Sequence, residues 1–184
     1  MRRVIQIIKD ASIIYTMHCQ TSVGWFRAVS DGNYLIRLDW NQAGWAQHDP
    51  PDDVSRETII QLKAYFHGKL QYFNLPLLPS GVSQIQRHWL DTMANIPFGT
   101  TISYTELATA AGHPKAARAA GMACATNPIL IIYPCHRVLR KDGSVGNYSG
   151  SAHLPPWHAD NLGRKAFLID LERRHLHLKI KEGN

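Results

Sequence analysis

The sequence predicts an α/β chain in two parts, with strands and one helix before residue 79 and a mainly helical domain from residue 80 onward. The first part alternates apolar and polar residues in short runs separated by turn residues, which is typical of half-buried strands. The second part contains two helical segments joined by a tight glycine turn. We therefore expect an N-terminal domain over 1–79 and a C-terminal domain over 80–184.

Three strands and one helix are expected in the first part. The strands are Ser12 to Met17, Trp25 to Val29 and Tyr34 to Trp40. Ser55 is a candidate cap for a helix that runs toward His67 and ends at Gly68. The segment from Leu75 to Gly81 contains two prolines and a glycine, and this composition predicts a linker between the domains.

The second part is expected to hold four helices and one strand. The helices are Val82 to Ala94, Tyr104 to Ala111, Ala116 to Ala125 and Gly163 to Arg174. Gly112 makes the turn between the second and third helices, and Pro114 suits the first turn of the third. The apolar run from Ile129 to Tyr133 predicts a buried strand.

Composition limits the class of protein. Hydrophobic residues make up 45% of the chain and charged residues 18%, which is typical of a soluble globular protein without a membrane span. Lys9 and Asp10 interrupt the first apolar run before a signal peptide could form. The three cysteines show no paired spacing, which argues against a disulfide framework and a thiolate zinc site. We expect a reducing, cytoplasmic location.

Positive charge is concentrated in the second part of the chain. Residues 1–79 hold 8 Lys and Arg against 7 Asp and Glu, whereas residues 80–184 hold 12 against 7. The local balance is thus +1 in the first part and +5 in the second. This excess makes the second part a candidate for binding a polyanion, although a solvated basic face would have the same composition.

The run from Asn127 to Val138 places a thiol and an imidazole at the end of an apolar segment. Pro134 cannot extend a strand ladder, so Cys135 is presented where regular pairing stops, beside His136. A cysteine in an apolar run is more often a core residue. The surrounding segments favour a reactive thiol instead.

Three segments around Cys135 closely resemble the O6-alkylguanine-DNA alkyltransferases. They are Pro114 to Gly121 (PKAARAAG), Asn127 to Val138 (NPILIIYPCHRV) and Gly143 to Gly150 (GSVGNYSG). Weaker likeness extends through 21–32 and 61–77. The resemblance implies a small ribonuclease-H-like α/β domain followed by a winged helix-turn-helix domain whose wing covers Arg140 to Gly143.

The reaction implied by the resemblance is direct reversal of DNA damage. Cys135 would accept a methyl or other alkyl group from O6-alkylguanine, with O4-alkylthymine a possible second substrate. A relay of Glu172, His136 and a water would ionise the thiol, whose ordinary pKa is about 8.5. Asp170 is the alternative acid, and either carboxylate could instead be an exposed helix charge. The thioether has no leaving group, so the protein would act once and need no cofactor.

The resemblance also implies how DNA is held. A monomer of the protein would bind double-stranded DNA through the minor groove, with little sequence preference. Arg118 matches the arginine that fills the gap left by the flipped nucleotide, and Asn127 matches a hinge residue. Tyr104 matches the tyrosine that crowds the target phosphate, although it could also anchor its helix. Further DNA contacts are assigned to Thr105, Ala117, Ala119 and Gly121, and helical facing predicts that about half of the small residues pack inside.

The base pocket is assigned to residues that follow or flank the reactive segment. They are Tyr148, Ser149, Val145 and Cys124. Residues 151–164 are about ten residues longer than the usual family spacing, and they either cap or widen the pocket or form a surface excursion. His153 and His158 lie there without nearby acids or cysteines, so no metal site is expected.

Three other functions were weighed. A protein that binds alkylated bases and recruits repair factors without transfer would be a relative that lacks the cysteine, so Cys135 argues against it. A transcriptional regulator is disfavoured because the helix Ala116 to Ala125 lacks base-reading side chains. Cysteine-dependent hydrolysis is disfavoured because no separate histidine or oxyanion motif is recognisable.

Overall fold

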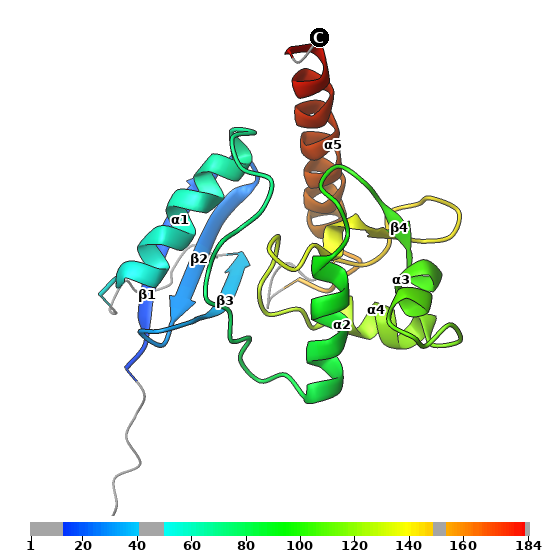
Figure 1. Cartoon of the computed structure of the whole chain (residues 1–184), viewed down its shortest axis with the longest axis horizontal. Coiled ribbons are helices and arrows are strands. Elements are labelled where there is room, and N and C mark those ends of the chain that lie inside the picture. Colours follow the sequence, from blue (N-terminus) through cyan, green and yellow to red (C-terminus); the bar gives the residue numbers. More distant parts are fainter. Residues whose placement is uncertain (1–12, 41–49, 149–153, 183–184) are drawn as a thin grey trace, which may run out of the picture.

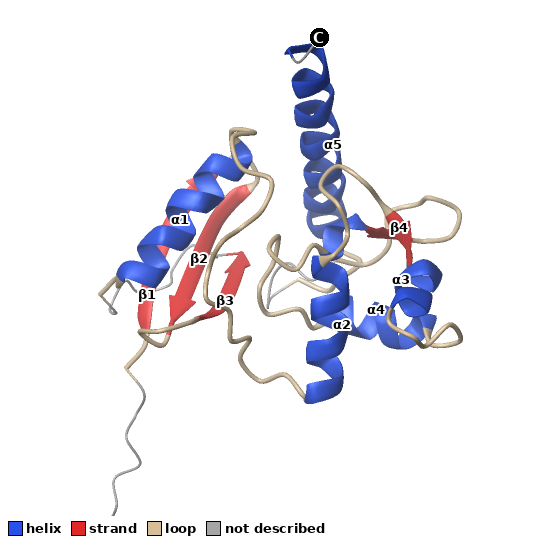
Figure 2. Cartoon of the chain, in the orientation of Figure 1, coloured by secondary structure: helices blue, strands red, loops and turns tan. Residues whose placement is uncertain are grey.

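The computed structural model describes residues 13–40, 50–148 and 154–182. Strands lie almost entirely in the first part of the chain and helices dominate the second, as Figure 2 shows. The strands and α1 form one unit, and the remaining helices form a second unit beside it (Figure 1). The mixed α/β class expected from the sequence is confirmed.

The N-terminal sheet is an antiparallel meander with one helix packed on it. Its strands are β1 (Tyr15–Thr21), β2 (Gly24–Ser30) and β3 (Leu35–Trp40), in the order β1-β2-β3. Helix α1 (Asp53–Phe66) covers one face. Phe26 and Leu38 from the strands and Leu62 from the helix are fully buried in this layer, so the alternation in the sequence reflects a sheet with one core face.

The outer edge of β3 is covered by two segments from outside the sheet. Leu35 pairs with the predicted linker, donating to Pro76 and accepting from Leu78. Further along, the Leu38 N–H donates to the Pro128 carbonyl, and Leu130 donates back to Leu38. The unpaired groups of an edge strand are thus satisfied, and the second of these contacts ties the sheet to the segment that leads to Cys135.

Helix α1 begins earlier than predicted. The cap is Asp52, whose carboxylate accepts from the Ser55 N–H at 2.8 Å and from the Ser30 hydroxyl at 2.7 Å. Ser55 is the third helical residue and completes a capping box by accepting from the Asp52 N–H. The assignment of Ser55 as the cap is therefore wrong, because a carboxylate one turn upstream satisfies the first N–H groups.

The C-terminal part contains the expected helix-turn-helix. Its helices are α2 (Gln84–Ala94), α3 (Tyr104–Ala110) and α4 (Ala117–Ala125). Ser103 and Glu106 form a capping box that starts α3. The short strands β4 (Ile102–Ser103) and β5 (Val138–Leu139) pair in parallel, and a turn over 140–143 follows β5, closed by Gly143 donating to the Arg140 carbonyl.

The predicted strand from Ile129 to Tyr133 is wrong. The segment makes only single bridges, from Ile129 to Leu38 and from Leu130 to Tyr133, and Ile131 has a φ of 69°. A β-branched residue rarely adopts that left-handed conformation. The turn is held because Tyr133 donates to the Ile129 carbonyl while Asn127 binds both ends of the segment. The apolar run is buried as a compact loop and not as an extended strand.

Two further boundaries differ from the predictions. The first strand was predicted from Ser12 to Met17, whereas β1 extends to Thr21. Ser12 lies outside the described residues. Helix α5 (Ala159–Glu182) extends beyond the predicted Gly163 to Arg174 at both ends, so part of the extra segment 151–164 is its first turns. Within the described ranges, no helix combines the length and apolar character needed to cross a membrane.

The Asp52 cap yields a stability prediction. Replacing Asp52 with Ala should lower the free energy of unfolding by about 1–2 kcal/mol, because the first turn of α1 and the buried Ser30 hydroxyl lose their acceptor. Urea denaturation followed by circular dichroism measures the change. Asp53→Ala is the matched control, since Asp53 is fully exposed, and it should change stability by less than about 0.5 kcal/mol. Equal effects of the two substitutions would contradict the capping role.

Candidate active site

Cys135 lies at the start of a 3-10 turn that spans Cys135–Arg137, where the compact loop ends. Its side chain is buried, with 1% of the residue exposed. The Asn127 amide donates to Cys135 Sγ at 3.2 Å and to the Tyr133 carbonyl at 2.8 Å. The Asn127 carbonyl oxygen accepts from Ile129. Asn127 therefore closes the loop and presents a hydrogen-bond donor to the sulfur.

Glu172, on α5, is the hydrogen-bonding centre of the site. Its two oxygens accept from Tyr65 Oη (2.8 Å), His136 Nε2 (2.9 Å), Arg137 Nη2 (2.8 Å), Arg137 Nε (2.9 Å) and the Gly99 N–H (2.9 Å). Burial alone would raise the pKa of Glu172, but His136 and Arg137 hold it well below its ordinary value. A buried carboxylate with this set of donors stays ionised.

The geometry assigns the tautomer of His136. An ionised carboxylate only accepts hydrogen bonds, so the Nε2 that faces Glu172 carries the proton and Nδ1 keeps its lone pair. Nδ1 is buried and has no hydrogen-bond partner among the described residues. Burial lowers the pKa of His136, although the Glu172 carboxylate opposes that shift. His136 is therefore a neutral imidazole with a basic nitrogen ready to accept a proton.

Arg137 holds the carboxylate from behind. Asp170, the alternative acid expected from the sequence, is instead exposed and pairs with Arg174 at 2.6 Å. Arg137 forms a two-pronged ion pair with Glu172 and donates to the Ile96 carbonyl. Gly99, in the adjacent turn, has a φ of +76° that favours glycine, and this conformation directs its N–H to Glu172.

Tyr104 and Lys165 meet on the other side of the reactive turn. Lys165 Nζ donates to the Val138 carbonyl at 2.6 Å and lies 3.5 Å from Tyr104 Oη. A Cβ at Gly146 would lie 2.6 Å from Tyr104 Oη, so the backbone approaches the phenol as only glycine allows. Burial raises the pKa of Tyr104 and lowers that of Lys165. The phenol is thus a neutral hydrogen-bond donor.

The residues assigned to DNA contact fall into two groups. Arg118, Ala119 and Thr105 are exposed on the helix-turn-helix. Ala117 is half-buried, and Gly121 lies against the Tyr104 ring, where a Cβ would come within 3.9 Å of it. The structure therefore brings the first three to the surface, whereas Ala117 and Gly121 are half-buried.

Three of the four residues assigned to the base pocket lie within the described ranges. Tyr148 is buried and its hydroxyl has no partner among the described residues. Val145 is half-buried, and Cys124 Sγ contacts Met93 Sδ at 3.6 Å. Ser149 lies outside the described residues, as does His153. No disulfide joins the three cysteines.

The extra segment contacts the pocket wall through its backbone. The Tyr148 N–H donates to the Pro156 carbonyl at 3.0 Å. The neighbouring Trp157 side chain is 67% exposed and points away from the protein interior. The described part of this segment therefore braces the wall from outside.

Sequence reasoning missed Lys165 and Tyr65 as site residues. Lys165 and Glu172 are seven residues apart on α5, so two helical turns place them on one face. A lysine on an otherwise apolar helix face was a usable signal. Tyr65 comes from α1, more than a hundred residues away in sequence, and no local pattern points to its contact with Glu172.

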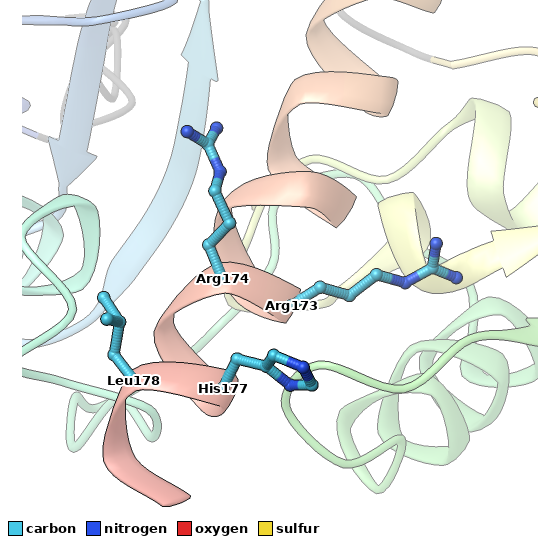
Figure 3. Close-up of a pocket in the computed structure, with 4 residues that line it drawn as sticks. All are labelled: Arg173, Arg174, His177 and Leu178. Carbon is cyan, nitrogen blue, oxygen red and sulfur yellow. The ribbon is translucent and has the colours of Figure 1, made fainter. Parts of the chain in front are cut away.

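A surface cavity of about 400 Å³ lies further along α5, lined by Arg173, Arg174, His177 and Leu178. In Figure 3, Arg173 and His177 extend to one side of the helix, and Arg174 and Leu178 to the other. None of these side chains belongs to the cluster around Cys135. This cavity is therefore separate from the cluster around Cys135.

The Glu172 network predicts a large stability effect. Glu172→Gln should lower the free energy of unfolding by about 3–5 kcal/mol, because the buried Arg137 guanidinium loses its counter-charge. Guanidinium denaturation measures the change. Asp170→Asn, which breaks an exposed pair on the same helix, should stay within about 0.5 kcal/mol of the wild type. A small effect of Glu172→Gln would mean that the carboxylate is not the structural centre of the site.

Family models and individual relatives match both parts of the chain. The family described as "6-O-methylguanine DNA methyltransferase, ribonuclease-like domain" matches residues 13–79, and its "DNA binding domain" matches residues 84–174. The methylated-DNA–protein-cysteine methyltransferase of Mycobacterium leprae is 38% identical over 170 residues, which cover 87% of this chain and 94% of that protein. The protein of the same name from Haemophilus influenzae is 32% identical and covers 87% of each chain.

Solved structures agree with these matches. The O6-methylguanine methyltransferase of Mycobacterium tuberculosis superimposes with a TM-score of 0.74 at 31% identity, covering 88% of this chain and 94% of that one. The same organism's protein in complex with DNA gives a TM-score of 0.69, covering 88% and 93%. The chain therefore belongs to the 6-O-methylguanine DNA methyltransferase family, whose curated relatives are methylated-DNA–protein-cysteine methyltransferases.

Proposed function

We propose that this protein repairs DNA by moving one alkyl group from guanine O6 to Cys135 Sγ, and that each molecule does so once. The observation that carries this proposal is the buried thiol with Asn127 donating to its sulfur, next in sequence to a neutral His136 held by an ionised Glu172. This arrangement provides a nucleophile, a base and a group that orients the base.

The reaction begins with ionisation of the thiol. A water between Cys135 and His136 Nδ1 carries the thiol proton to the imidazole, which Glu172 stabilises as it becomes positive. The thiolate then attacks the alkyl carbon, a carbon–sulfur bond forms and the bond to guanine O6 breaks. The electron pair moves into the purine, which gains a proton and becomes ordinary guanine. Tyr104 is suited to donate a hydrogen bond to the base as this negative charge develops.

The product explains the single use. A thioether offers no stabilised leaving group, and no described side chain is arranged to remove the alkyl group from sulfur. The thiol must be reduced before the reaction, so a reducing compartment suits this chemistry. We place the protein there without assigning an organelle.

The buried thiol requires the damaged nucleotide to leave the duplex. With 1% of Cys135 exposed, an O6 substituent inside stacked DNA cannot reach its sulfur. Arg118 is exposed on α4 and is flanked by small residues, so its side chain can fill the gap in the base stack while the helix backbone lies close to the minor groove. Phosphate contacts from the basic C-terminal part supply affinity for DNA without sequence preference. The protein binds the duplex as a monomer.

The proposed pocket is bounded by Tyr148 and Val145 on one side and by the reactive turn on the other. The buried Tyr148 hydroxyl is an unused hydrogen-bonding group at this wall. Pro156 fixes the backbone of Tyr148 from outside. The tolerated size of the alkyl group then depends on how far this wall yields, and the bracing by the extra segment favours small groups such as methyl.

Methyl transfer can be measured by intact mass. Mixing the protein with a duplex that contains one O6-methylguanine should add one methyl group per molecule, mapped to Cys135, because this thiol receives the Asn127 hydrogen bond and lies next in sequence to His136. Cys135→Ala should gain nothing. Cys19→Ala is the control, because Cys19 lies in β1 and burial raises its pKa to about 11.

Three outcomes of that experiment separate the candidate functions. Transfer to Cys135 supports the proposed repair reaction. Binding of the damaged duplex without a gain in mass would contradict it and would favour a lesion-binding protein that recruits other factors. Methylation at Cys19 or Cys124 would move the acceptor to another residue.

Arg118 is expected to act on DNA and not on the chemistry. Arg118→Ala should slow transfer from duplex DNA by about tenfold or more, because flipping the nucleotide leaves a gap that costs a few kcal/mol of stacking. The rate with free O6-methylguanine base should stay unchanged. Rapid-quench kinetics with both substrates measures the difference, and Lys115→Ala provides an exposed positive-charge control. Equal slowing with both substrates would contradict the role in flipping.

A further inference from the structure

Tyr65 reaches from the N-terminal domain into the proposed relay. It lies on α1, is fully buried, and its hydroxyl donates to Glu172 Oε1 at 2.8 Å. The same oxygen accepts from His136 Nε2. Tyr65 therefore contacts the atom that orients the proposed base, from a helix that otherwise packs on the three-stranded sheet.

The ring of Tyr65 is fixed on several sides. It packs edge-on against Phe98 with centroids 6.0 Å apart and lies 5.7 Å from the Phe73 ring. The Arg137 guanidinium lies 5.7 Å from the centroid of the Phe98 ring, so the aromatic pair also supports the second partner of Glu172. Tyr65 is thus held in one orientation by packing, and its hydroxyl points at the carboxylate.

We propose that Tyr65 is a positioning residue for the transfer reaction, through which the N-terminal domain sets the state of the His136–Glu172 pair. This inference rests on the function proposed above. It assigns to the ribonuclease-like domain a part in the chemistry in addition to its part in folding.

The physical effect concerns where a proton resides. Burial and the nearby Glu172 carboxylate raise the pKa of Tyr65 well above its ordinary value, so the hydroxyl remains a neutral donor. The charged groups that face Glu172 are His136 and Arg137, and the positive charge of Lys165 also lowers the pKa of His136. Tyr148 is a second buried phenol, and its proximity raises the pKa of Tyr65 further.

The sign of the effect follows from these partners. A hydrogen bond to the carboxylate stabilises the negative charge of the His136–Glu172 pair, and this lowers the affinity of the pair for an extra proton. Removing the hydroxyl raises that affinity. The pair then takes up a proton at higher pH, and a protonated His136 cannot accept the proton of Cys135.

The test is Tyr65→Phe, which keeps the ring and removes only the hydroxyl. Because each molecule acts once, the amplitude of the methyl-transfer time course gives the fraction of competent protein. The rate constant gives the speed of the transfer step. The acidic limb of the plot of rate constant against pH should move up by about one pH unit, which means an approximately tenfold lower rate constant at a fixed pH on that limb. Affinity for unreacted duplex should stay unchanged.

Two control variants separate positioning from stability. Leu62→Ala creates a cavity on the same helix and should reduce amplitude and stability while leaving the pH profile of the rate constant unchanged. Tyr72→Phe removes a hydroxyl from an exposed tyrosine of the same domain. It should change neither the amplitude nor the pH profile of the rate constant.

The outcomes distinguish this inference from the function on which it rests. A wild-type pH profile in Tyr65→Phe, with at most a smaller amplitude, overturns the role of Tyr65 and leaves the repair reaction intact. Absence of transfer in the wild-type protein overturns the proposed function and this inference together. A shifted profile in Tyr65→Phe that Leu62→Ala does not show supports the inference.

Discussion

The burial of one carboxylate constrains the whole site. Glu172 is almost completely enclosed, and an ionised group in that position is tolerated only where donors and a counter-charge surround it. Its donors come from α1, the turn before β4 and the 3-10 turn, and Glu172 itself lies on α5. Four segments that are distant in sequence must therefore be in place together before His136 acquires its orientation. The geometry of the nucleophile is a property of the complete fold.

Hydrogen bonds to Asn127 and to β3 hold the compact loop before Cys135. Asn127 binds both ends of that loop, and Leu38 of the N-terminal sheet pairs with Pro128 and Leu130 at its middle. An extended strand would satisfy these groups with a neighbouring strand and would carry Cys135 away from Asn127. The left-handed conformation of Ile131 is retained because the surrounding bonds fix it, as is common where strain occurs beside a functional residue.

The sequence was informative where local chemistry decides the structure. The helix-turn-helix was predicted from the turn at Gly112 and from Pro114 at the start of the next helix, and the proximity of Cys135 to His136 is a matter of adjacency. The conformation of 129–133 was mispredicted, because an apolar run has the same pattern in a buried loop and a buried strand. The contact of Tyr65 with Glu172 was invisible, since it depends on how two domains pack.

Helix α5 joins both sides of the reactive turn. Glu172 and Lys165 share one face, so the helix delivers a carboxylate to His136 and an ammonium group to the backbone at Val138 and to Tyr104. The extra segment adds the turns before Lys165 and braces Tyr148 through Pro156. A shift of α5 along its axis would therefore move His136, Tyr104 and the backbone of Tyr148 together. In the proposed reaction, the long helix would thus keep the proton-transfer group and the pocket wall in fixed relative positions.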